Sequence, residues 1–157
     1  MEHVIGDTAR LVGTDGGAKM SKSLGNTVYL SDTKDAIREK VMKMYTDPNH
    51  LKVEDPGRVE GNAVFSYLDI FDADKDGVAA LKAQYEKGGL GDVAIKQRLV
   101  EVLDGLIAPI RARREELAKD PAAVMRILEE GTKKARAKGE ATMREVRKAL
   151  KIDYFGN

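Results

Sequence analysis

The sequence predicts a mainly α-helical bundle that is preceded by a glycine-rich segment, and three observations lead to this fold class. The chain has 157 residues, 42% of them apolar but only 5% aromatic, with no Trp and no Cys. This composition predicts a core of Leu, Ile, Val, Ala and Met, which favours packed helices. Apolar residues recur at three- and four-residue spacing after residue 30, whereas the first 30 residues are rich in Gly and predict loop with short extended stretches.

Five helices are expected, and the first three have clear start or stop signals. Ser31 or Asp32 caps the first, which runs to about residue 45 and is closed by Pro48. The second starts near residue 61 after the turn at 55–57, and the third spans 76–87 and ends at a pair of glycines. One side of the first helix is expected to carry Ala36, Ile37, Lys40, Val41 and Met44. The second carries Val64, Tyr67, Leu68 and Phe71 at three- and four-residue spacing.

The last two helices are long. The fourth begins with Asp92 as its cap, reaches about residue 118 and contains Pro109, which predicts a kink. Its expected inward stripe is Val93, Val100, Leu103, Ile107 and Ile110. The fifth has Asp120 as cap and Pro121 in its first turn, and it continues to about residue 150.

The composition excludes several classes of protein. Without Cys there is neither a disulfide framework nor a Cys-based zinc site, and a reducing cytoplasm is expected. No apolar run approaches the roughly 20 residues of a membrane span, and the N-terminus does not resemble a secretion signal. The net charge is +1, but residues 111–157 hold 13 Lys and Arg against 8 Asp and Glu. The C-terminal third is therefore basic.

The basic residues of the last predicted helix form a stripe. At about 100° per residue they fall within an arc of roughly 120°. This basic arc consists of Lys133, Arg136, Arg144, Arg147, Lys148 and Lys151. The opposite side carries the expected core-facing stripe of Val124, Leu128, Ala135, Val146, Ala149 and Leu150. Glu129 and Glu140 lie within the basic arc, so a solvated face with ion pairs and a phosphate-binding face are both open from the residues alone.

The segment 13–26 carries the clearest chemical signal. Two lysines and two small hydroxyls stand on a glycine-flanked loop, in the run Lys19, Met20, Ser21, Lys22 and Ser23. Ammonium and hydroxyl groups suit a polyphosphate whose charge moves during displacement, so nucleotidyl transfer is the chemistry indicated. The spacing does not match the phosphate loop of the NTPases, and a solvated basic loop is the alternative.

This run is identical to the KMSKS signature of class I aminoacyl-tRNA synthetases. Further stretches resemble the tryptophanyl-tRNA synthetase family in order and spacing, and they are 25–26, 44–48, 59–62, 91–96 and 109–117. The resemblance covers nearly the whole chain. It implies an ATP-dependent tryptophan–tRNA ligase, with ATP and the Mg²⁺ that it carries as substrate and with tRNA as partner. It further implies that Lys22, and less directly Lys19, contact the pyrophosphate of ATP, while Ser21 and Ser23 shape the loop.

The resemblance also implies a domain division. Residues 1–30 correspond to the end of a Rossmann-like nucleotide-binding domain, and residues 31–157 to a helical domain of the anticodon-binding type. The matched region is a C-terminal half, so the HIGH-type signature and the tryptophan pocket are expected outside this chain. We therefore expect the chain alone to be inactive, and the parent to be a cytoplasmic homodimer. With tRNA as the implied ligand, phosphate contact becomes the favoured role of the basic arc.

A calcium-loop pattern at 72–77 is not expected to bind metal. Acidic residues occupy loop positions one, three and five, but Ala83 stands where a bidentate Glu is needed. A helix-to-helix turn whose aspartates cap is the preferred interpretation. His3 and His50 are expected to be surface or turn residues, and no metal site is predicted.

Two other functions are consistent with the residues. One is a free-standing, non-catalytic tRNA-binding paralogue. The other is a helical interaction module that retained the loop by descent.

Overall fold

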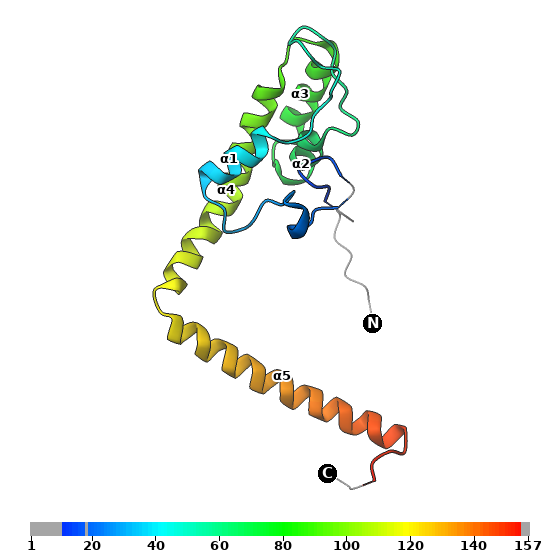
Figure 1. The fold of residues 1–157 in the computed structure, drawn as a ribbon, viewed down its shortest axis with the longest axis vertical. Helices are drawn as coiled ribbons and strands as arrows, with labels where there is room; N and C mark the ends of the chain where they lie inside the picture. Colours follow the sequence, from blue (N-terminus) through cyan, green and yellow to red (C-terminus); the bar gives the residue numbers. More distant parts are fainter. Residues whose placement is uncertain (1–10, 18, 155–157) are drawn as a thin grey trace. The chain divides into compact units, whose positions relative to one another are not determined.

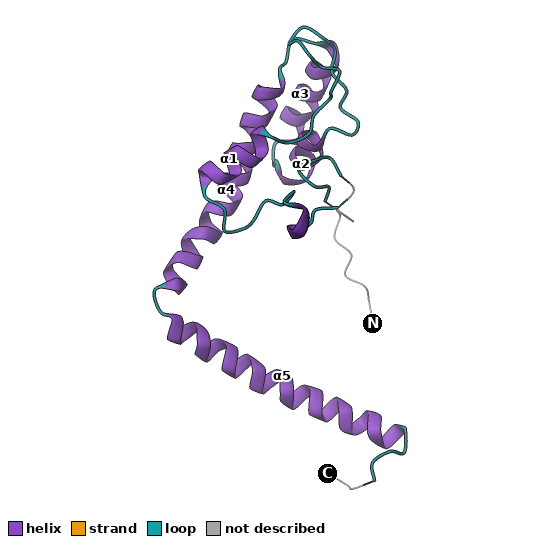
Figure 2. Cartoon of the chain, in the orientation of Figure 1, coloured by secondary structure: helices purple, strands orange, loops and turns teal. Residues whose placement is uncertain are grey.

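The computed structural model describes residues 11–17 and 19–154, and it is mainly helical, as predicted (Figures 1 and 2). The elements in chain order are a 3₁₀ turn η1 (Lys22–Leu24), α1 (Lys34–Met42), α2 (Ala63–Phe71), α3 (Lys75–Lys87), α4 (Asp92–Ala118) and α5 (Pro121–Ala149). All five predicted helices are present, and the described residues contain no strand. His3 lies outside the described residues.

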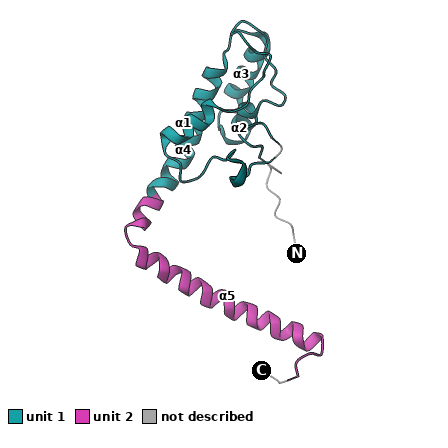
Figure 3. Cartoon of the chain, viewed as in Figure 1, with its two compact units in different colours: residues 1–112 teal, residues 113–157 magenta. Residues whose placement is uncertain are grey.

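The chain divides into two compact units, 1–112 and 113–157 (Figure 3). The predicted boundary after residue 30 falls inside the first unit, and the descent of residues 1–30 from a nucleotide-binding domain stays a prediction. None of the described helices combines the length and apolar character that crossing a membrane requires.

Helix starts differ from the prediction by a few residues. Thr33 caps α1 by accepting a hydrogen bond from the Ala36 N–H at 3.2 Å, so the expected cap at Ser31 or Asp32 is wrong. The Asp32 carboxylate instead binds the Lys40 ammonium at 2.5 Å. Asn62 caps α2 through the Val64 N–H. A capping side chain accepts a hydrogen bond from the backbone N–H two or three residues later in the chain, and Thr33 and Asn62 stand at that distance from the N–H groups that they bind.

The core lies in the first unit and is richer in aromatic side chains than the composition predicted. Phe65, Tyr67 and Tyr85 are its largest fully buried side chains, which corrects the expectation of a purely aliphatic core. Each buried tyrosine has an acceptor: the Tyr67 hydroxyl donates to the Val12 carbonyl oxygen, and the Tyr85 hydroxyl donates to Asp92, both at 2.7 Å. A few aromatic residues suffice because each side chain is large, and both tyrosines satisfy their hydroxyls while buried.

The buried stripe of α4 matches the prediction in part, because Val100, Leu103 and Ile107 are buried as expected. Val93 is 54% exposed and Ile110 41% exposed, so both are wrong as core residues. The buried row instead repeats every four residues and consists of Ile95, Leu99, Leu103 and Ile107, with Val100 beside it. The helix continues past Pro109, and its residue four earlier is an exposed glycine. Solvent can therefore reach the carbonyl that loses its N–H partner.

Helix α5 starts as predicted, with the Asp120 carboxylate accepting from the Ala123 N–H at 2.9 Å and Pro121 in the first turn. Its predicted core-facing stripe is wrong for this structure, because α5 has no buried residue. Leu128 is 57% exposed and Leu150 64% exposed. An amphipathic pattern specifies which face is apolar but supplies no partner for it, and the second unit contains no other long helix among its described residues.

The acidic turn before α3 has the capping role predicted for it. The Asp74 carboxylate accepts from the Gly77 N–H at 2.9 Å, and Asp72 accepts from the Asp74 N–H at 2.9 Å. Arg98 of α4 binds both carboxylates, at 2.7 and 3.0 Å. The turn joins α2 to α3 along the chain, and these two ion pairs hold it against α4.

Candidate functional site

The loop 13–26 is held to the helical core at its base. The Tyr45 N–H donates to the Thr14 carbonyl oxygen at 2.9 Å, and the Thr14 N–H donates to the Asn26 carbonyl oxygen at 3.1 Å. Gly16 has φ of +76°, and a Cβ atom there would overlap the Tyr45 ring. The base of the loop therefore requires glycine for both its backbone angle and its packing.

Asn26 organises the interior of this loop and is only 4% exposed. Its Oδ1 accepts from the Ser21 N–H at 2.7 Å, and its Nδ2 donates to the Lys19 carbonyl oxygen at 3.1 Å. Nδ2 also lies 3.0 Å from both carboxylate oxygens of Asp15. One buried amide thus ties together both ends and the middle of the loop. In the sequence, Asn26 is distinguished only by the family match, because its role depends on contacts up to 11 residues away.

Both candidate lysines of this loop, Lys19 and Lys22, are exposed. Neither Lys19 nor Lys22 has a carboxylate within ion-pair distance among the described residues. Lys22 begins η1, and the hydroxyls of Ser21 and Ser23 are 2.9 Å apart. Met20 packs against the core. The structure therefore presents two unpaired ammonium groups from an anchored backbone, an arrangement suited to an anionic ligand.

Asp15 adds a negative charge to the other side of the loop. Its pKa lies below the usual value because its carboxylate accepts the Gly17 N–H and then the Asn26 amide. The carboxylate is therefore ionised at neutral pH and engaged within the loop. This leaves the lysines as the groups available to a ligand.

A second buried polar cluster, which the sequence analysis missed, is centred on Asp92. Its carboxylate accepts from the Thr46 hydroxyl at 2.5 Å and from the Tyr85 hydroxyl at 2.7 Å, and it lies 3.1 Å from His50 Nδ1. Burial raises its pKa, but these three hydrogen bonds lower it more, and the net pKa is below the usual value. Asp92 was predicted to cap α4, whereas its carboxylate contacts other segments instead.

His50 was predicted to be a surface or turn residue, and it closes a turn, since its N–H donates to the Asp47 carbonyl oxygen at 3.2 Å. Its side chain, however, is buried rather than on the surface, because it is only 2% exposed and its ring packs edge-on against Tyr85, with centroids 4.6 Å apart. Burial and the bond to Asp92 raise the pKa of the Tyr85 hydroxyl, which keeps it a donor at neutral pH. The cluster joins the segment after α1 to α3 and α4. The Asp92 cluster therefore holds the segment that follows Tyr45 in place.

The basic arc of α5 is exposed along its length. All six residues, Lys133, Arg136, Arg144, Arg147, Lys148 and Lys151, are solvent-accessible. Lys133 pairs with Glu129 at 2.6 Å, and no other member has an ion pair within the described residues. Surface pairs of this kind contribute little, so the arc keeps most of its positive charge available.

Comparison with known proteins places the chain among the tRNA synthetases. The family model for tRNA synthetases class I (W and Y) matches residues 2–107. The chain is 55% identical over 152 residues to the tryptophan–tRNA ligase of Clostridium longisporum, and the match covers 97% of the chain and 45% of that protein. It is 56% identical over 148 residues to that of Streptococcus pyogenes serotype M3, covering 93% of the chain and 44% of that protein.

Solved structures give the same result. A crystal structure of tryptophanyl-tRNA synthetase from Campylobacter jejuni, complexed with ADP and tryptophan, matches with a TM-score of 0.74 and 31% identity. The match covers 92% of this chain and 44% of that one. The chain spans less than half the length of these relatives.

Proposed function

The chain belongs to the tRNA synthetases class I (W and Y), and on that premise we propose that it is the part of a tryptophan–tRNA ligase that carries the lysine loop and the tRNA-binding helices. The observation that carries this proposal is the loop 13–26. Its backbone is anchored by Asn26, while Lys19 and Lys22 extend into solvent. A fixed backbone with free ammonium groups is what stabilisation of a leaving polyphosphate requires.

In the proposed reaction the tryptophan carboxylate attacks the α-phosphate of ATP. A bond forms between the carboxylate oxygen and phosphorus, and the bond to the bridging oxygen breaks, so negative charge builds up on the departing pyrophosphate. Lys22 stabilises this charge most directly and Lys19 less directly, while Met20, Ser21 and Ser23 set the shape of the loop. ATP brings its own Mg²⁺, and the aminoacyl group then passes to tRNA.

The helical part supplies the contact with tRNA. The basic arc of α5 offers guanidinium and ammonium groups along one helix face, and such groups bind phosphates without regard to sequence. Phosphate contacts position an RNA, and base contacts specify it. The arc is therefore proposed to hold the tRNA rather than to identify it.

The remaining partners belong to the rest of the enzyme. The relatives are about twice as long as the matched region, so the polypeptide that completes the ATP and tryptophan sites is proposed to lie outside this chain. A homodimeric parent is part of the proposal. So is a cytoplasmic location, since tRNA ligases act where protein is made.

A chimera tests the function of the loop. In it, this chain replaces the matching segment of the Clostridium longisporum ligase, and tryptophan-dependent exchange of pyrophosphate into ATP is measured. We expect Lys22→Ala to lower exchange by a factor of roughly 10² or more with tryptophan binding nearly unchanged, because the loss is confined to the transition state. Lys19→Ala is expected to cost less. Lys87→Ala, which removes an exposed charge from the end of α3, is the matched control.

If Lys22→Ala lowers the rate of pyrophosphate exchange by less than about threefold, the loop is a solvated basic segment with no role in the reaction. An equal loss in Lys87→Ala would show that overall charge, rather than the loop, determines the rate.

A further inference from the structure

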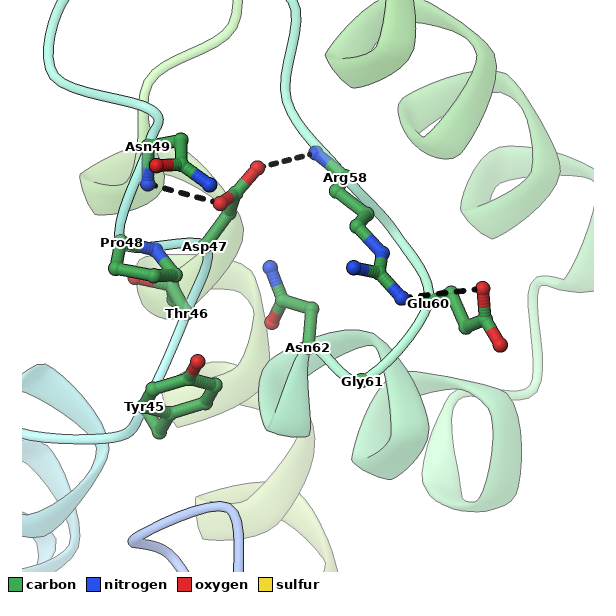
Figure 4. A pocket seen from close by; sticks show the side chains of 9 residues that line it. All are labelled: Tyr45, Thr46, Asp47, Pro48, Asn49, Arg58, Glu60, Gly61 and Asn62. Carbon is green, nitrogen blue, oxygen red and sulfur yellow. Dashed lines mark hydrogen bonds and ion pairs between the residues drawn. The ribbon is translucent and has the colours of Figure 1, made fainter.

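A small polar pocket lies between the segment that follows α1 and the turn that precedes α2. Its volume is about 240 Å³, and residues 45–49, 58 and 60–62 line it (Figure 4). Sites for drug-sized ligands usually measure roughly 300–1,000 Å³. The pocket therefore suits one small group rather than a whole nucleotide. Neither the lysine loop nor the basic arc contributes to its lining.

Asn62 places an unpartnered hydrogen-bond donor in this pocket. The residue is 1% exposed, and its Oδ1 accepts from the Val64 N–H at 3.0 Å as the cap of α2. That bond settles the orientation of the amide, so Nδ2 is the atom on the other side. Nδ2 is buried without a hydrogen-bond partner, and Figure 4 shows it directed between Asp47 and Arg58. Buried donors normally have a partner, so this one indicates an acceptor that the chain itself does not supply.

The facing wall offers an acceptor and a movable cation. The Asp47 carboxylate is fixed by the backbone N–H groups of Asn49 and Arg58, at 2.9 and 2.8 Å. Each of its oxygens keeps a lone-pair direction for a further donor. The Arg58 side chain is 69% exposed, and its guanidinium pairs with Glu60 at 3.3 Å, a weak surface contact that a ligand can replace.

The remaining walls favour a flat ligand and disfavour a phosphate. Tyr45 is 45% exposed and, together with Pro48, supplies an apolar surface. The charges that line the pocket are two carboxylates, Asp47 and Glu60, against one guanidinium, Arg58. This net negative charge opposes an anion. A neutral planar heterocycle with an acceptor beside a donor matches the wall groups.

We propose that this pocket binds a single unpaired RNA base, with an acceptor of the base on Asn62 Nδ2 and a neighbouring donor on Asp47. Every nucleobase carries an acceptor beside a donor on its pairing edge, and unpaired bases stack on aromatic and guanidinium planes, here Tyr45 and Arg58. The inference rests on the proposed tRNA-binding function. It adds a base contact to a chain whose basic arc supplies only phosphate contacts.

The test uses the full 157-residue chain, labelled with ¹⁵N, and single-stranded RNA hexamers as probes at low salt. Hexamers of A, of C, of U and of mixed sequence are compared with an abasic ribose-phosphate hexamer of the same charge. We expect the base-containing hexamers, and not the abasic one, to shift the side-chain amide resonances of Asn62. These resonances are assigned by their loss in Asn62→Asp, which keeps a good cap for α2 but replaces the donor by a carboxylate.

Affinity measurements on variants complete the test. Relative to the abasic hexamer, which meets the same added negative charge, the preferred hexamer is expected to bind about three- to tenfold more weakly to Asn62→Asp, the range for one lost hydrogen bond. Arg58→Gln, at an exposed position where folding is not at risk, is expected to weaken it to a similar extent. Lys87→Ala removes the same charge outside the pocket and should leave the preference among bases unchanged. Helix content by circular dichroism checks that Asn62→Asp is folded.

The possible outcomes separate this inference from the function on which it rests. If the hexamers bind through α5, as shown by loss of binding in an Arg144, Arg147 and Lys148 charge reversal, but the Asn62 resonances do not respond, the pocket proposal is wrong and the arc proposal stands. The inference is also overturned if the abasic hexamer shifts the Asn62 amide resonances as much as the base-containing hexamers do. It is overturned as well if other parts of the protein fill the pocket in the chimera and RNA cannot enter it. If no RNA binds at all, both proposals fail.

Discussion

Replacing Asn26 by Ala is expected to open the lysine loop without unfolding the helices. The side chain contributes two hydrogen bonds between uncharged groups, from the Ser21 N–H and to the Lys19 carbonyl oxygen, and a third interaction with the exposed Asp15 carboxylate. All three join parts of one loop. Their loss therefore changes the local opening free energy of residues 13–26, while the core of α1 to α4 keeps its contacts.

The size of the effect follows from the two uncharged bonds. Each contributes about 1 kcal/mol net, so opening becomes easier by about 2 kcal/mol, or about thirtyfold. Hydrogen exchange of the Thr14 amide measures this, because its bond to the Asn26 carbonyl oxygen at 3.1 Å is kept in the variant and breaks only when the loop opens. Amides of α2, which make no contact with Asn26, provide the internal control. A change below about threefold at Thr14, or an equal change throughout α2, would refute the assigned role.

A second variant, Asn26→Asp, tests the same contacts through pH. In the native loop the pKa of Asp15 is lowered, first by the Gly17 N–H and then by Asn26, so this stabilisation is present above the ordinary carboxyl pKa of 3.8 and is lost as pH falls through the folded value. In Asn26→Asp two carboxylates face each other, and opening is fastest at neutral pH. The variant should therefore close, and the native loop should open, as pH falls below about 4. Parallel pH profiles would contradict the geometry.

Three other outcomes are expected. The 157-residue chain alone should catalyse no tryptophan-dependent pyrophosphate exchange, and exchange by protein free of host synthetase would contradict this. Reversing Arg144, Arg147 and Lys148 to Glu should abolish tRNA binding. In the native chain, the log–log slope of affinity against salt concentration should be about −2 to −4, for three to five neutralised phosphates. Unchanged binding by the reversed variant, at matched low salt and helix content, would show that the arc is only a solvated face. Asp92→Asn should lower the free energy of unfolding by about 2 kcal/mol at pH 7. Because the folded pKa of Asp92 is lowered, this difference from the native chain should shrink as pH falls through that value, and a difference that persists in acid would exclude ionisation as its cause.

Signals within a few residues of each other were predicted well. The existence of the five helices, the cap at Asp120 and the capping turn at 72–74 depend on neighbours along the chain, and the structure confirms them. The KMSKS run was found for the same reason, because its letters are contiguous. The family that it indicated is confirmed by the comparisons.

Contacts between distant residues were not predictable in this way. The bond from Tyr67 to Val12 spans 55 positions, and the bond from Thr46 to Asp92 spans 46. A short polar residue at the start of a helix, such as Asp92, is predicted from sequence to be a helix cap. Only the packing of α3 and α4 shows that its carboxylate instead binds side chains of other segments. The same holds for His50, whose burial no local pattern indicated.

By itself, the sequence determined the helices, the composition of the lysine loop and the positive arc of α5, because spacing and charge are properties of the chain. Tertiary structure alone decided that Asn26 organises the loop, that Asn62 directs a free donor into a pocket, and that the apolar stripe of α5 has no partner among the described residues. The physical reason is that burial and hydrogen-bond satisfaction depend on which surfaces meet. A periodic pattern states that a face must be covered, and only the folded chain shows what covers it.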